Sequence, residues 1–95
     1  MLTNVEIIYR EGIPKDTVML TVPKTNYWLE CRKWLNGSFR VTVVNPMTTY
    51  RKEVWRSIPE AELDRIFNQL CRMGSFNSKT TGKHLLQEIR RMYQK

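Results

Sequence analysis

The side chains that could do chemistry are concentrated in the last quarter of the chain. Gly74, Gly82 and Lys83 are the residue types of a nucleotide-binding P-loop. Seven residues rather than four separate the two glycines, and His84 stands where a serine or threonine would bind magnesium. This spacing argues against a P-loop. It leaves the amides of a helix start, beside Lys79 and Lys83, as a plausible contact for a phosphate group.

His84 is the only histidine, so a histidine-rich metal site is excluded. Glu88 follows four residues later, and on a helix the two side chains could meet on one face. General acid-base cleavage of RNA needs only such groups with a nearby Lys or Arg, so a ribonuclease is the enzymatic alternative. We favour an exposed surface pair, and we predict no catalytic residue, no metal and no cofactor.

Basic residues interleaved with aromatic ones are the strongest remaining signal. Sixteen Lys and Arg against nine Asp and Glu give a formal charge of +7, of which residues 51–95 carry +5. Such a surplus favours an anionic partner, nucleic acid first, because Lys and Arg neutralise phosphates and aromatic rings stack on unpaired bases. We predict that nucleic acid or another partner binds Arg40, Arg51, Lys52, Arg56, Lys79, Lys83, Arg90 and Arg91.

The elements that must position these residues are those of a single small α+β domain spanning residues 1–95. Alternating apolar residues predict strands over 4–10, 17–22, 38–44 and 50–56. The first two should form a hairpin. We therefore expect an antiparallel β-meander of four or five strands over about residues 4–56.

Residues 25–35 fit two interpretations. As a helix, the segment would be capped by Thr25 or Asn26. As a strand, it would join residues 38–44 through Asn36-Gly37, because both residues tolerate the positive φ of a type I′ turn. The Asn-Gly pair favours the strand.

Two amphipathic helices should follow, over about residues 58–73 and 81–94, both packed on one face of the sheet. Ser57 and Glu60 have the spacing of a capping box, Pro59 suits a first helical turn, and Gly74 suits a left-handed helix end. The carboxylates at the start of the first helix complement its dipole, so we assign them a structural role. The expected apolar stripes are Leu63, Ile66, Phe67, Leu70 and Met73, and then Leu85, Leu86, Ile89, Met92 and Tyr93.

We therefore expect a non-enzymatic nucleic-acid-binding module that uses a basic surface of the sheet and the C-terminal helix. The alternative is a small protein-interaction module, such as a phage or mobile-element inhibitor or regulator that docks on a host protein or ribonucleoprotein. Its Trp, Tyr, Met and Arg content is typical of such interfaces. The oligomeric state stays open.

The chain contains no apolar run long enough for a membrane span and no signal-peptide pattern, so we expect a cytoplasmic location and no membrane partner. Cys31 and Cys71 are too few and too far apart for a disulfide scaffold or a metal site. We expect both to be reduced and buried.

Overall fold

The computed structural model describes residues 16–93, apart from the side chains of Leu35, Trp55 and Arg56. It confirms the predicted α+β arrangement of an antiparallel meander followed by two helices. The elements are β1 (Thr17–Thr21), β2 (Trp28–Lys33), β3 (Ser38–Val44), β4 (Arg51–Pro59), α1 (Glu60–Arg72) and α2 (Gly82–Tyr93). The strand predicted over residues 4–10, and its hairpin, lie outside the described residues.

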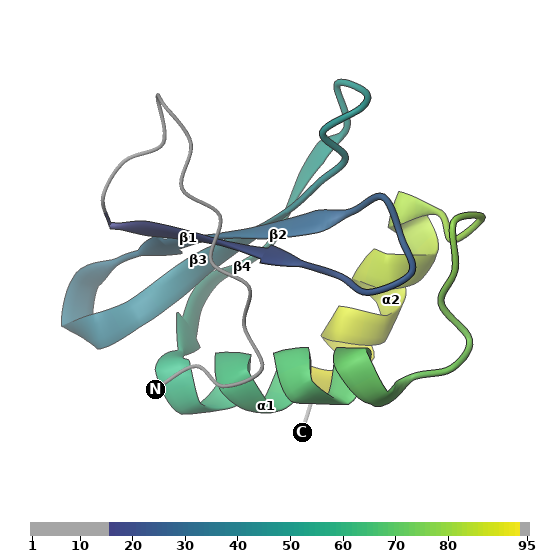
Figure 1. Ribbon diagram of the computed structural model, residues 1–95. Coiled ribbons are helices and arrows are strands. Elements are labelled where there is room, and N and C mark those ends of the chain that lie inside the picture. Colours follow the sequence, from purple (N-terminus) through teal and green to yellow (C-terminus); the bar gives the residue numbers. More distant parts are fainter. Residues whose placement is uncertain (1–15, 94–95) are drawn as a thin grey trace.

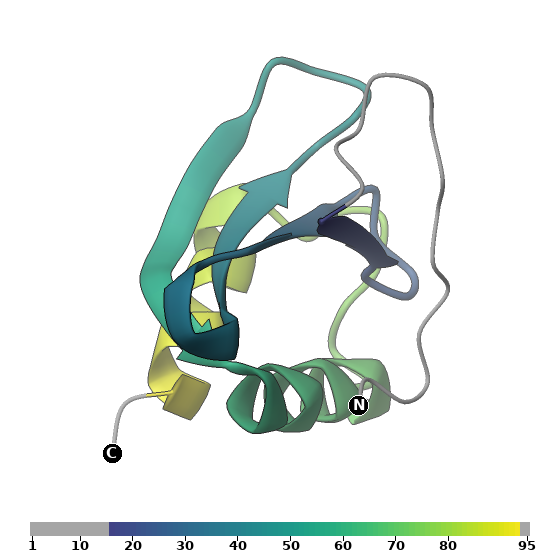
Figure 2. The same cartoon turned by 90° about the vertical axis from the view of Figure 1, so that its left-hand side faces the viewer.

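The four strands pair in the order β1-β2-β3-β4, each antiparallel to the next. Both helices lie on one side of the sheet, as predicted, with α1 crossing beneath the strands (Figure 1). After a quarter turn, the twisted sheet is seen above α1 (Figure 2). The core between the two layers includes Leu20, Leu29, Val41, Val43, Ile58, Leu63, Ile66, Phe67, Leu70, Phe76, Leu85 and Ile89. We call the face of the sheet that points away from the helices the outer face.

The ambiguous segment is a strand, since β2 spans Trp28–Lys33 and pairs with both β1 and β3. Asn36 and Gly37 have positive φ values of 62° and 72°, as the turn prediction requires. The amide of Trp34 donates to the carbonyl of Ser38 at 2.7 Å, and this bond encloses Leu35 as well. The turn therefore has three residues, Leu35–Gly37, rather than the two of a type I′ turn.

The junction between β4 and α1 differs from the prediction. β4 continues to Pro59, which pairs with Ser38, and the helix begins only at Glu60. Ser57 is still in the strand, where its hydroxyl donates to Ser38 Oγ at 2.8 Å. Pro59 occupies the N-cap position and no side chain caps the helix. The predicted capping box is wrong because the sheet ladder holds Ser57 in an extended backbone.

The end of α1 lies where predicted but has another cause. Gly37 is the only glycine with a positive φ among residues 16–93, so Gly74 is not a left-handed cap. Instead Met73 turns extended, with φ −73° and ψ 120°, while its amide still donates to the carbonyl of Leu70. The chain leaves the helix at Met73, and the glycine after it is not required for that turn.

The two cysteines are both free. Cys31 is fully buried under the helices, as predicted, whereas Cys71 on α1 is only half-buried. α2 buries Leu85, Leu86, Ile89 and Met92 of the predicted stripe, and Tyr93 is half-buried at its edge.

Candidate nucleic-acid interface

The exposed face of α2 carries three of the eight predicted basic residues. Lys83, Gln87 and Arg90 recur at the spacing of one helical face, and all three are exposed. Arg91 is exposed beside them. The opposite face of the helix is the buried stripe, so the fold leaves these basic side chains directed to solvent.

The loop before α2 carries the exposed Lys79 and is held by its own hydrogen bonds. The amide of Lys79 donates to Asn77 Oδ1 at 2.8 Å, and the amide of Thr80 donates to the Asn77 carbonyl at 3.0 Å. Thr81 then caps the helix, because its Oγ1 accepts from the amide of His84 at 3.1 Å. Lys79 therefore belongs to a loop whose backbone is held by hydrogen bonds, just before the N-terminal, positive end of the helix dipole.

Gly82 allows the start of α2 to lie close against Tyr50. A Cβ atom at this position would lie 2.4 Å from Cζ of Tyr50, the residue that precedes β4. Tyr50 also meets the ring of Tyr27 edge-on, with centroids 5.8 Å apart. Burial, and to a smaller extent Tyr27, raises the pKa of Tyr50, whereas the positive charge of Arg90 opposes the rise. Arg90 of α2 therefore lies close enough to Tyr50 for its charge to act on the phenol group just before β4.

The positive charge of α2 is mostly not neutralised within the described chain. Residues 79–93 contain four basic side chains and one acidic one, a net charge of +3. The acidic one, Glu88, accepts from Arg91 at 2.6 and 3.2 Å. Among residues 16–93, no carboxylate forms an ion pair with Lys79, Lys83 or Arg90.

The predicted sheet arginines are placed differently. Arg40 donates through two nitrogens to Glu53, at 3.1 and 3.3 Å, and Arg51 donates to Glu30 at 2.7 Å. These ion pairs lie on the outer face of the sheet, whereas α2 packs on the other face. Two of the three arginines described on the outer face are thus matched by a carboxylate.

The other two basic residues predicted on the sheet are Lys52 and Arg56. Lys52 is exposed on β4, opposite Val43 in the register. The side chain of Arg56 lies outside the described residues. The structure therefore places Lys83, Arg90 and Arg91 on one helix, with Lys79 in the loop before it, and places Arg40 and Arg51 on the outer face of the sheet.

His84 and Glu88 are not joined into an acid-base pair. The ring of His84 packs edge-on against the buried ring of Phe76, with centroids 5.6 Å apart, and its backbone amide binds Thr81. The carboxylate of Glu88 is held by Arg91, and no hydrogen bond within residues 16–93 links it to His84.

The predicted site omits Arg32 and Trp34, which the structure brings together with Arg40. The guanidinium carbon of Arg40 lies 4.6 Å from the ring centroid of Trp34. Both omitted residues are exposed, and Trp34 shows 45% of its surface although large aromatic residues are usually covered. The sequence did carry a signal for this pair. Arg32 and Trp34 are two residues apart in a predicted strand that ends at a turn, and this spacing puts both side chains on the same face of the sheet.

Comparisons with known proteins identify no relative, because no family model, curated protein or solved structure matches the chain. Within residues 16–93, no group of three or more His, Cys, Asp and Glu is placed to hold a metal ion. Neither helix of that part of the chain has the length and apolar character needed to cross a bilayer.

Proposed function

We propose that this protein binds nucleic acid through the exposed face of α2 and the loop before it. The observation that carries the proposal is the positive charge of Lys79, Lys83 and Arg90, which no carboxylate of the described residues neutralises. Phosphates can supply the missing negative charge, and the release of counterions from the nucleic acid drives the association. The location expected for such a protein is the cytoplasm.

Several features support α2 rather than the sheet as the main contact. Cations already held by carboxylates, such as Arg40 and Arg51, must exchange one anion for another and gain less from a phosphate. α1 begins with Glu60 and Glu62, which would repel a phosphate backbone. We therefore assign the binding surface to Lys79, Lys83, Arg90 and Arg91 and exclude the start of α1.

Charge reversal on α2 tests the proposal against a matched control. Arg90→Glu should weaken binding to DNA or RNA by about tenfold at about 50 mM salt, because each phosphate contact contributes roughly that factor. Arg72→Glu makes the same change in net charge at the exposed last residue of α1 and should leave affinity nearly unchanged. The measurement is fluorescence anisotropy with labelled oligonucleotides, after thermal melts show that both variants fold.

Equal losses in the two variants would show that only net charge matters and would contradict the assignment to α2. Absence of binding by the unmodified chain at low salt would remove the proposal altogether.

The exposed Met47, with 78% of its surface accessible in the loop between β3 and β4, favours protein docking as the second candidate. A host partner retained after nuclease treatment, and lost in Met47→Glu, would support that function instead.

A further inference from the structure

Trp34 is an exposed indole that is nevertheless held in place. It follows the last residue of β2, and the guanidinium carbon of Arg40 on β3 lies over one face of its ring, 4.6 Å from the ring centroid. Arg40 is fixed in turn by its two hydrogen bonds to Glu53 on β4. Because Arg40 restrains the ring and Glu53 restrains Arg40, a ligand that stacks on the ring costs little further side-chain freedom.

An arginine whose charge is not matched lies beside this ring. Arg32 is two residues before Trp34 and is the direct cross-strand neighbour of Arg40. Like charges in this position repel each other. Arg40 is compensated by Glu53, whereas no carboxylate within residues 16–93 forms an ion pair with Arg32. An anion at this point would relieve the repulsion between the two arginines.

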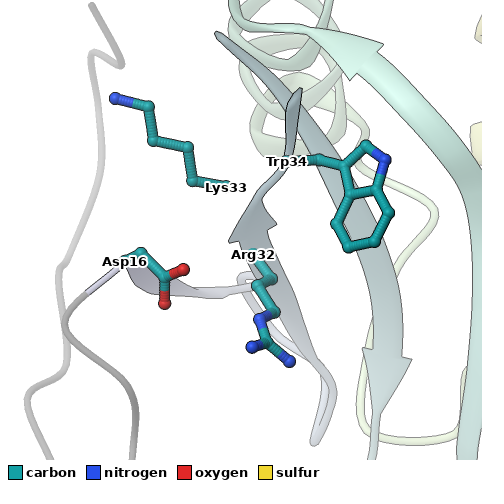
Figure 3. Close-up of a pocket in the computed structure, with 4 residues that line it drawn as sticks. All are labelled: Asp16, Arg32, Lys33 and Trp34. Atoms are coloured by element: carbon teal, nitrogen blue, oxygen red, sulfur yellow. The ribbon is translucent and has the colours of Figure 1, made fainter. Parts of the chain in front are cut away.

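These side chains border an open hollow of about 440 Å³, lined by Asp16, Arg32, Lys33 and Trp34. Figure 3 shows Arg32 between Asp16 and Trp34, with the side chain of Lys33 pointing away from them. The volume is in the range of small-molecule sites. The hollow thus offers an aromatic surface, a cation and a carboxylate oxygen that can accept a hydrogen bond.

We propose that this hollow binds one unpaired nucleotide of a single-stranded nucleic acid, with its base stacked on Trp34 and its phosphate at Arg32. The inference rests on the proposed function and names its substrate class, because bases in a duplex are already stacked and cannot reach the indole. A planar ring next to a phosphate matches an indole next to an arginine better than an acidic side chain does, since a carboxylate would use only Arg32.

The test compares single strands with duplexes of the same length, about 15 nucleotides, which is close to the upper site size of small single-strand binders. Trp34→Ala in the full chain should weaken binding to oligothymidine or oligouridine by about 5- to 150-fold, the effect of losing one stacked base. Binding to the duplex should be unchanged. Trp34→Phe should keep most of the single-strand affinity, because it retains an aromatic ring for stacking.

Arg32→Gln is a second variant that leaves Trp34 and its contact with Arg40 in place. It should also weaken binding to single strands and leave binding to the duplex unchanged. If Trp34→Ala changes neither affinity, or lowers both equally, the inference is overturned. Should Arg90→Glu still weaken binding in that case, the proposed function survives. Binding to polyglutamate that depends on Trp34, with no effect on single strands, would assign the hollow to acidic peptides and overturn the inference too.

Discussion

Cys31 is a thiol with almost no access to water. It lies on β2 with 0% of its surface exposed, and its Sγ donates weakly to the carbonyl of Leu29 at 3.8 Å. Burial raises the pKa of Cys31 far above its ordinary value of 9.0, and the charge of Glu30 adds to the rise. The folded state therefore keeps a proton that the unfolded chain releases in alkali.

The stability of the protein should consequently fall with pH above about 9. Below this pH, Cys31 is protonated in both the folded and the unfolded state, and its contribution to the free energy of unfolding is fully present. Above it, unfolding releases a proton, so the free energy of unfolding falls by at most about 1.4 kcal/mol per pH unit for this thiol. Urea unfolding from pH 8 to pH 10 measures the slope, and Cys31→Ala should make it shallower. An identical slope in the variant would contradict the prediction.

At the scale of elements, the fit of α2 against β4 depends on one missing side chain. Gly82→Ala would bring a methyl group into steric overlap with two ring carbons and the hydroxyl oxygen of Tyr50. Since that ring also packs on Tyr27, it cannot move freely, and we expect a loss of about 1–3 kcal/mol in the free energy of unfolding. Urea unfolding of the variant measures this loss.

Gly74→Ala is the matched control, because nothing lies within 4 Å of its added Cβ atom and its φ is not positive. It should be neutral or slightly stabilising. In a Tyr50→Ala background the methyl group of Gly82→Ala would meet open space, so most of its cost should disappear. A cost that persists there would mean that the clash with Tyr50 is not its cause.

The elements themselves were predictable because they follow from local patterns. Alternation predicts β3 over residues 38–44, the range observed, and helical periodicity predicts the buried stripe of α2. The start of α1 was not predictable in this way. Ser57 has the spacing of a helix cap, but its partner is Ser38, nineteen residues earlier in the chain, and the strand pairing decides between the two. The capping motif is visible in the local sequence, whereas the strand pairing that overrides it joins residues far apart in the chain and cannot be read from residue spacing.

At the scale of the whole molecule, most of the described arginines on the outer face are paired with a carboxylate, whereas most cations of α2 and the loop before it are not. The outer face pairs Arg51 with Glu30 and Arg40 with Glu53, across twenty-one and thirteen residues of sequence. The face of α2 has one internal pair, Arg91 with Glu88. Counting basic residues could identify both regions from the sequence, but only the folded sheet shows which cations already have an anion.

This separation predicts how salt should affect each part of the surface. On single strands, log K falls with log salt concentration by about 0.7 per phosphate contact. Replacing Lys83 and Arg90 together by Gln removes two such contacts and should make the slope shallower by about 1.4. Trp34→Ala removes a stacking contact that carries no charge, so it should lower the affinity while leaving the slope unchanged. Titrations at several salt concentrations measure both, and a slope that responds to Trp34→Ala but not to the α2 variant would reverse the roles assigned to these two surfaces.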